Sequence, residues 1–156
     1  MNNNVNEIVG ALVADFAAMP GGLLPLLHAV QDRLGYIPPS SVPLIARGLN
    51  LSRAEVHGVI TYYHHFRQAP AGKHVVQVCC AESCQACGSE ALLAAASTAL
   101  GCAPGTTRAD GAVTLEPVYC LGLCAASPAV QIDAALHARV TPEALHGLLA
   151  KLEDVQ

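Results

Sequence analysis

Apolar side chains in the first 70 residues recur every three or four positions, the spacing of one face of an α-helix. This pattern predicts four short helices. The first of them runs through Ile8, Leu12, Phe16 and Met19. The second is expected to end at Gly35, and the fourth to begin with the capping-box pair Ser52 and Glu55. Residues 1–70 are therefore expected to form a four-helix module with a small core.

The pattern changes after a linker of small residues at positions 68–73, where β-branched and alternating runs replace the helical spacing. The predicted strands are 74–78, 113–118, 129–133 and 136–140, and the predicted helices are 89–100 and a final one that starts at Thr141. Pro117 indicates an edge strand or a strand end. The order β-α-β-β-β-α predicts that residues 71–156 form a compact α/β domain with a mixed sheet.

Composition narrows the class of protein. Of the 156 residues, 53% are hydrophobic and only 13% are charged, about half of the roughly 25% typical of globular chains. Such a chain is neither disordered nor a coiled coil. No apolar run approaches the ~18 residues of a membrane span, and no signal-peptide pattern is visible, so a cytoplasmic protein without membrane insertion is expected. The net charge of −4, without a Lys/Arg cluster, argues against a nucleic-acid partner.

The shortage of charge also bears on protein partners. A freely diffusing electron carrier generally uses a strongly charged face to meet transient partners, because such fields raise association rates. This chain has 8 basic and 12 acidic residues. It is therefore expected to be a permanent subunit whose apolar surface is covered by its neighbours.

Seven cysteines lie in the second half of the chain. They are Cys79, Cys80, Cys84, Cys87, Cys102, Cys120 and Cys124. Two pairs, Cys79-x4-Cys84 and Cys120-x3-Cys124, each follow a predicted strand. Four thiolates from two loops suit either a tetrahedral zinc ion or a 2Fe–2S cluster. The small, apolar loop at 120–128 favours the cluster, because it shields sulfur from water.

Other partitions of the cysteines remain open at this point. Cys84-x2-Cys87 has the form of a thioredoxin-like dithiol, and together with Cys79 it also matches the plant-type ferredoxin spacing. Both alternatives leave Cys120 and Cys124 partly or wholly unused. In the two-pair interpretation the three remaining cysteines are small buried hydrophobes. These are Cys80, Cys87 and Cys102.

Histidines and carboxylates offer no competing chemistry. A Rieske-type site using some of the histidines near the linker is disfavoured, since four well-spaced cysteines already complete a site. Those histidines are His57, His64, His65 and His74. No Ser/His/Asp set, carboxylate pair or phosphate-binding glycine loop is present. No catalytic residue and no substrate chemistry are therefore expected on this chain.

Two segments, residues 78–92 and 116–125, resemble the thioredoxin-like 2Fe–2S ferredoxin family. Residues 35–38 and 51–63 resemble the helical segment of that family. The resemblance implies one 2Fe–2S cluster and a thioredoxin-like fold for the second domain. The cluster ligands that it implies are Cys79, Cys84, Cys120 and Cys124. One departure is Cys87, at a position where the family usually has another residue.

The family includes the small ferredoxin subunits of NADH:quinone oxidoreductase and of NAD-linked hydrogenases and formate dehydrogenases. The runs 51–65 and 81–85 most resemble the gamma subunit of soluble NAD-dependent formate dehydrogenase. The resemblance therefore implies an electron-transfer subunit of such a complex, which exchanges electrons with an FMN- and NAD-binding subunit beside a catalytic subunit. The alternatives are the equivalent subunit of NADH:quinone oxidoreductase or hydrogenase, a zinc-stabilised interaction domain, and a dithiol oxidoreductase using Cys84 and Cys87.

Overall fold

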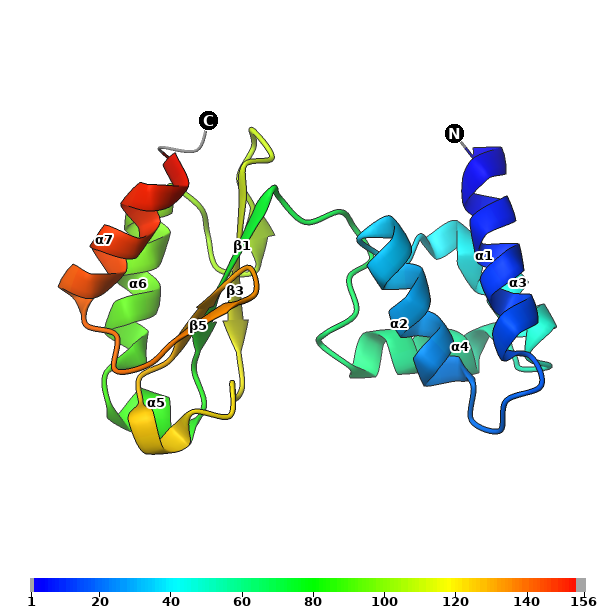
Figure 1. Cartoon of the computed structure of the whole chain (residues 1–156), viewed down its shortest axis with the longest axis horizontal. Coiled ribbons are helices and arrows are strands. Elements are labelled where there is room, and N and C mark those ends of the chain that lie inside the picture. Colours follow the sequence, from blue (N-terminus) through cyan, green and yellow to red (C-terminus); the bar gives the residue numbers. More distant parts are fainter. Residues whose placement is uncertain (1, 154–156) are drawn as a thin grey trace. The chain divides into compact units, whose positions relative to one another are not determined.

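The structure, a computed structural model, describes residues 2–153 and divides the chain into two compact units. The first unit is Met1–Pro70 and the second is Ala71–Gln156. The described residues form seven α-helices and five strands, and the strands all belong to the second unit (Figure 1).

The first unit contains four α-helices, as the periodicity predicts. They are α1 (Asn2–Phe16), α2 (Leu23–Leu34), α3 (Val42–Gly48) and α4 (Arg53–Tyr62), and a 3₁₀ turn, Pro39–Ser41, precedes α3. Their apolar faces meet in one core. Its fully buried members include Val9, Leu26, Leu27, Val30, Ile37, Ile45 and Val56. Burial of these side chains away from water is the main favourable contribution to the stability of the unit.

The helix ends follow their sequence signals in two cases and depart from them in one. Gly35 caps α2 with a φ of 80°, and its backbone N–H donates to the Gln31 carbonyl oxygen. The prediction that Met19 belongs to the first helix is wrong. Helix α1 ends at Phe16, and Met19 lies in the following turn with 46% of its surface exposed. Pro20 and the two glycines after it favour a turn over another helical repeat.

The capping box at the start of α4 supplies a first testable prediction. The Ser52 hydroxyl accepts a hydrogen bond of 3.1 Å from the Glu55 backbone N–H, and the Glu55 carboxylate accepts one of 2.8 Å from Ser52 N–H. Ser52→Ala removes the first bond and is expected to lower the free energy of unfolding by about 1 kcal/mol. Urea unfolding measures this loss. Ser52→Thr retains a capping hydroxyl and is the matched control; an equal loss in both variants would contradict the capping role.

The second unit is built on a mixed sheet of five strands in the order β2-β3-β1-β4-β5. The strands are β1 (His74–Cys79), β2 (Thr106–Thr107), β3 (Val113–Val118), β4 (Val130–Ile132) and β5 (Ala135–His137). Strands β1 and β3 are parallel, and the other pairs are antiparallel. The predicted α/β class with a mixed sheet is therefore confirmed.

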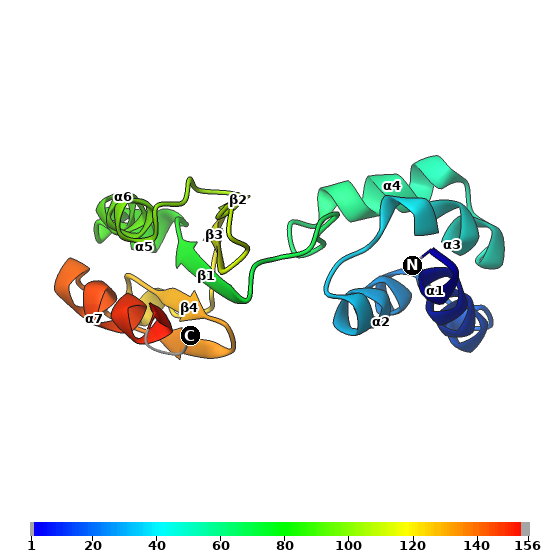
Figure 2. The ribbon, with the colours of Figure 1, turned by 90° about the horizontal axis from the view of Figure 1, so that it is seen from above.

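Two long helices cover one face of this sheet (Figures 1 and 2). They are α6 (Ser89–Leu100) and α7 (Pro142–Glu153), and a short helix, α5 (Glu82–Ala86), precedes them. Leu92 and Ala96 of α6 and Leu145 of α7 pack with strand residues in one core. The strand residues of that core are Val76, Val78, Val113, Leu115, Val130 and Ile132. The core lies directly beneath the strands that lead into the cysteine segments.

Three details of the sheet differ from or sharpen the sequence analysis. Helix α5 and strand β2 were not predicted, and β5 ends at His137 where a strand through residue 140 is expected from the sequence. Pro117 pairs with Val78 near the end of β3, whereas β2 pairs only with Thr114 and Leu115. Proline thus lies beyond the segment where a second neighbour would need its missing N–H.

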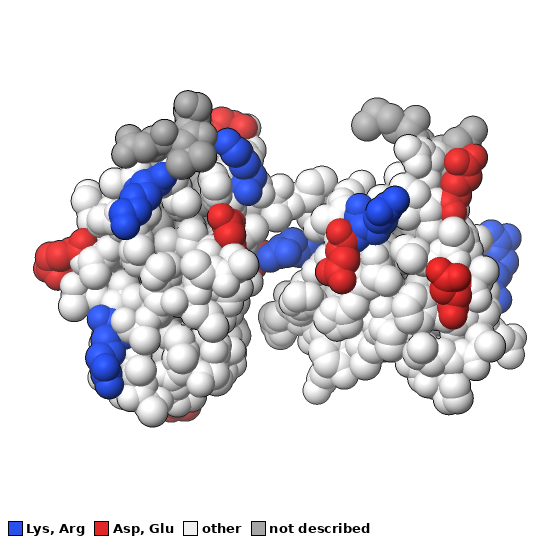
Figure 3. Space-filling model, in the orientation of Figure 1, with Lys and Arg blue, Asp and Glu red and all other residues white. Residues whose placement is uncertain are grey.

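The surface carries few charges. Most of the surface visible in Figure 3 belongs to residues other than Lys, Arg, Asp and Glu. Several large apolar side chains are exposed, among them Tyr62, Tyr63, Tyr119 and Leu136. Among residues 2–153, no helix combines the length and apolar character that crossing a membrane requires.

Candidate metal centre

The two cysteine pairs lie at the same edge of the sheet. Cys79 is the last residue of β1, and Cys84 lies in α5, which follows directly. Cys120 comes two residues after β3, and Cys124 begins a 3₁₀ turn, Cys124–Ala126. Because β1 and β3 are parallel, with Cys79 in register with Val118, the segments that leave both strands start side by side. The carboxyl ends of parallel strands are a common place for ligand sites.

Backbone hydrogen bonds fix the segments that carry the first pair. Cys79 N–H donates to the Ala129 carbonyl oxygen at 3.0 Å, and Cys80 N–H donates to the Val118 carbonyl oxygen at 2.7 Å. These bonds tie the end of β1 to both flanking segments. The Cys79 position is therefore set by the sheet and not by a free loop.

The second pair has the geometry of two ligands on one metal ion. The Cys120 and Cys124 sulfur atoms are 3.7 Å apart. A metal–sulfur bond of about 2.3 Å in tetrahedral geometry places two ligand sulfurs about 3.8 Å apart. Gly122 N–H points at Cys120 Sγ at 3.3 Å, and Gly122 has a φ of 77°, which a glycine adopts without steric cost. A donor aimed at sulfur stabilises a thiolate ligand.

Burial distinguishes the two pairs. Cys79 and Cys84 are each 2% exposed and pack with Ala129 in a small apolar cluster, whereas Cys120 and Cys124 are exposed. The side chains packed against this cluster are Ala81, Val118, Leu121 and Leu123. Leu121 and Leu123 come from the segment between Cys120 and Cys124. The site is thus sheltered from water on the side of Cys79 and Cys84 and open on the other.

The pKa of Cys84 reflects this mixed surrounding. Burial alone would raise the pKa of its thiol, but three hydrogen bonds outweigh burial and leave the pKa below its ordinary value. They come from the Ser127 hydroxyl, the Cys79 thiol and the Ala129 backbone. The groups that surround Cys84 therefore favour the thiolate, the form that binds metal.

Cys124 shows the opposite shift, and its causes connect all four thiols. Its pKa is raised, first by the hydrogen bond with Cys120, then by the negative charge of Cys120, by burial, and by the charges of Cys84 and Cys79. The four sulfur groups are therefore close enough to repel one another as thiolates. A bound metal cation reverses this repulsion, because it stabilises each thiolate that coordinates it.

The donors are arranged as two pairs and not as one group around a single point. Within residues 2–153, no three or more His, Cys, Asp or Glu side chains are grouped closely enough to hold one metal ion. A structural zinc ion takes four ligands around one centre. A 2Fe–2S cluster takes two thiolates on each of its two irons. The observed pairs fit the second donor pattern.

The other cysteines and the histidines stand apart from these pairs. Cys102 is buried in the main core of the second unit, and its sulfur lies 3.1 Å from the Thr106 carbonyl oxygen. Cys80 is half-buried, and its pKa is raised by burial and by the charges of Cys79, Cys84 and Glu90, against a hydrogen bond with Ser89. Cys87 is exposed at the end of α5, and all seven cysteines are free thiols. The interpretation of Cys87 as a buried hydrophobe is therefore wrong.

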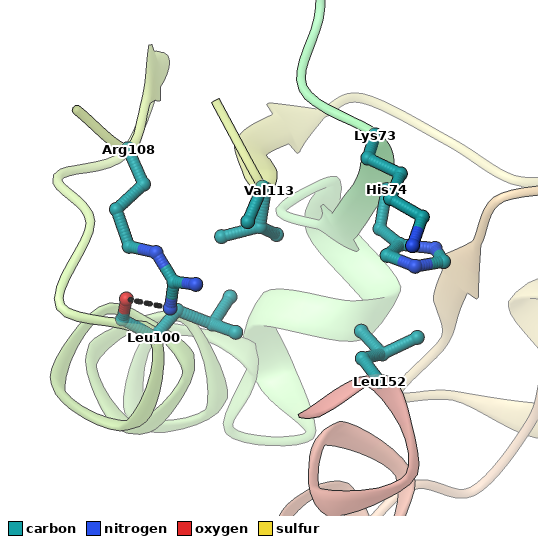
Figure 4. Close-up of a pocket in the computed structure, with 7 residues that line it drawn as sticks. Lys73, His74, Leu100, Arg108, Val113 and Leu152 are labelled. Atoms are coloured by element: carbon teal, nitrogen blue, oxygen red, sulfur yellow. Dashed lines mark hydrogen bonds between the residues drawn. The ribbon is translucent and has the colours of Figure 1, made fainter. Parts of the chain in front are cut away.

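His74 belongs to a separate cavity, shown in Figure 4. It starts β1, and its Nδ1 lies 2.8 Å from an Asp133 carboxylate oxygen. The cavity has a volume of about 30 Å³ and is lined by Lys73, His74, Leu100, Arg108, Ala112, Val113 and Leu152. It lies at the opposite end of β1 from Cys79, and no cysteine lines it. Its size admits a water molecule and not a cofactor.

Sequence reasoning missed two serines that join the cysteine segments. Ser83 Oγ and Ser127 Oγ are 2.9 Å apart, and Ser127 Oγ lies 3.3 Å from Cys84 Sγ. The only signal was their position, since Ser83 directly precedes Cys84 and Ser127 follows Cys124 by three residues. A serine in a loop commonly bonds to its own backbone, so sequence alone gives no reason to connect the two.

A fold with paired thiols at one edge of a mixed sheet defines a small iron–sulfur protein, and comparison with known proteins specifies the family. The thioredoxin-like [2Fe-2S] ferredoxin family matches residues 9–153. The chain belongs to this family, as its motifs predict. The cofactor is one 2Fe–2S cluster, which the family and its donor pattern share.

Relatives with curated names include several subunits of NADH-quinone oxidoreductase. The one from Pseudomonas aeruginosa is 37% identical over 123 residues, covering 79% of this chain and 74% of the relative. A second, from Rhizobium meliloti, is 34% identical over 145 residues, covering 93% of this chain and 86% of the relative. The third, subunit 2 of the Thermus thermophilus enzyme, is 36% identical over 131 residues, covering 83% and 72%.

Among solved structures, the air-oxidised NAD⁺-reducing [NiFe]-hydrogenase contains a similar fold. The TM-score is 0.70 at 22% sequence identity, over 85% of this chain. The matching region spans 23% of the hydrogenase chain. This likeness supports the α/β fold described above.

Proposed function

We propose that this chain is an electron-transfer subunit that binds its 2Fe–2S cluster through Cys79, Cys84, Cys120 and Cys124. The observation that carries the proposal is the pairing of these thiols at the ends of two adjacent parallel strands, in a member of a 2Fe–2S family. When bound, such a cluster accepts and releases one electron at a time, and a four-thiolate site favours a low potential, on the order of −400 mV in plant-type ferredoxins.

The protein's own residues have three tasks in this proposal. The sheet edge and α5 hold the thiols of Cys79 and Cys84 in a buried place, and the segment after β3 presents Cys120 and Cys124 at the surface. Leu121 and Leu123 limit the access of water to the sulfurs. The exposed side then becomes the route by which an electron enters or leaves, since transfer requires close approach of the partner.

Residues 71–156 are proposed to form the cluster domain and residues 1–70 a helical module that serves assembly. The division of the chain into two compact units supports this assignment. Tyr62 is 75% exposed and, with Tyr63, lines an apolar groove on the helical module. An exposed aromatic pair in a charge-poor surface suits an interface with a permanent partner.

The wider setting follows from the relatives and from the motifs. We infer that the chain works in a cytoplasmic, multisubunit NAD-dependent oxidoreductase beside an FMN- and NAD-binding subunit and a catalytic subunit. Names of relatives support a complex of NADH:quinone oxidoreductase type. The runs 51–65 and 81–85 favour soluble formate dehydrogenase, with NADH:quinone oxidoreductase and NAD-linked hydrogenase as alternatives.

Purification of the native complex tests this proposal. We expect the full chain to copurify with an FMN-containing subunit, and the complex to be brown and to show the EPR signal of a reduced 2Fe–2S cluster. Molybdenum in the complex would favour formate dehydrogenase over the two alternatives. A colourless chain with one bound zinc ion would contradict the proposal. Metal-free protein with thiol-exchange activity would instead support a dithiol oxidoreductase.

A further inference from the structure

Two serine hydroxyls join the segments that carry the two cysteine pairs. Ser83 lies in α5, one residue before Cys84, and Ser127 follows the 3₁₀ turn that starts at Cys124. Their oxygen atoms are 2.9 Å apart, and they lie 3.0 Å and 3.1 Å from the Cys124 carbonyl oxygen. Ser127 Oγ is also 3.3 Å from Cys84 Sγ. This network therefore contacts one cysteine of each pair.

The number of protons in the network determines which bonds form when Cys84 is a metal ligand. A thiolate sulfur has no proton and only accepts, and each hydroxyl has one proton to donate. Ser83 donates to the Cys124 carbonyl oxygen, which satisfies that acceptor. The Ser127 proton is then free to point at Cys84 Sγ. With Cys84 protonated, the thiol donates to Ser127 and the direction of the bond is reversed.

We infer that the Ser127 hydroxyl donates a hydrogen bond to the Cys84 sulfur of the bound cluster and thereby raises the reduction potential of this protein. The inference rests on the proposed function, since it takes Cys84 as a ligand. Reduction adds one electron and makes the sulfur more negative, so a donor aimed at it stabilises the reduced state more than the oxidised state. The Ser127 O–H bond remains intact, and no proton is transferred.

Burial makes this contact stronger than a similar one at the surface. Cys84 is 2% exposed and Ser127 is half-buried, so little water competes for the sulfur. Hydrogen bonds in such low-dielectric surroundings are electrostatically stronger than in water. The backbone donor on Cys120, Gly122 N–H, lies in an exposed segment, where water weakens its effect. Ser127 is therefore the side chain placed to set the potential.

The test is an EPR-monitored titration of the full chain with dithionite as the reductant, comparing Ser127→Ala with the wild type. We expect the equilibrium constant for reduction to fall about fivefold, which at 59 mV per tenfold is a shift of about −40 mV. Ser97→Ala is the matched control. Its half-buried hydroxyl also bonds to a carbonyl oxygen, that of Cys102 at 2.9 Å, but contacts no proposed ligand. It should keep the wild-type potential.

Two further variants keep the inference falsifiable if Ser127→Ala fails to retain the cluster. Ser127→Thr preserves the hydroxyl and should keep the wild-type potential. Ser83→Ala leaves the Cys124 carbonyl oxygen to compete for the Ser127 proton, so its potential should fall as well, by less than in Ser127→Ala. An unchanged potential in Ser127→Ala, or an equal shift in Ser97→Ala or Ser127→Thr, would overturn the inference.

The failure of this inference is distinguishable from the failure of the proposed function. If the wild-type chain binds a 2Fe–2S cluster and Ser127→Ala has the same potential, only the role of Ser127 is wrong. If the wild-type chain binds no cluster, or if the cluster survives loss of the Cys84 thiol without spectral change, the ligand assignment itself is wrong.

Discussion

Cys84→Ser is expected to remove or strongly alter the 2Fe–2S spectrum of this protein. Serine replaces a soft thiolate with a hard, weakly acidic hydroxyl at a position that is 2% exposed. Loss of an outer-shell partner alone costs ~10–100-fold in metal affinity, and loss of a ligand should cost more. Iron per chain, visible absorption and the EPR signal of the dithionite-reduced protein measure the effect.

Cys87→Ser is the matched control, because it makes the same chemical change three residues further along. Cys87 follows the last residue of α5 and is exposed, whereas Cys84 is buried against Cys79 and Ala129. The control should therefore keep the full spectrum. The opposite result, loss of the cluster in Cys87→Ser and retention in Cys84→Ser, would replace the proposed ligand set by one that uses Cys87.

The sequence could predict this fold well where local and tertiary preferences agree. Gly35 and the pair Ser52 and Glu55 punctuate helices at the positions expected from their chemistry. It could not predict α5, whose five residues are too few to show a helical period. Strand β2, Thr106–Thr107, has only two residues and exists because β3 offers it a hydrogen-bonding edge.

The candidate site was predictable in its residue types and spacing and not in its surroundings. The Cys-x4-Cys and Cys-x3-Cys spacings identify two pairs, but burial of one pair and exposure of the other depend on the packing of Ala129 against Cys79 and Cys84. The contact between Ser127 and Cys84 joins residues 43 positions apart. Only the register of the parallel strands brings such positions together.

The second large effect is expected when the core beneath the cluster site is weakened. Leu115 is fully buried in β3, where it pairs with Val76 of β1 on the sheet that presents the thiols. Leu115→Ala deletes buried methyl groups and leaves a cavity, which should lower the free energy of unfolding by about 2–5 kcal/mol. Because the fold holds the ligands together, loss of the cluster should occur at a correspondingly lower urea concentration.

Ile45→Ala makes a comparable deletion in the other unit and is the matched control. Ile45 is fully buried in α3, within the core of Met1–Pro70. It should shift the unfolding of helices followed by far-UV circular dichroism, while bleaching of the cluster followed by visible absorption stays at the wild-type urea concentration. If residues 71–156 hold the cluster without help from the helical module, only Leu115→Ala changes the bleaching. Equal shifts of bleaching in both variants would show that the two units unfold as one, and would contradict the proposed division of tasks.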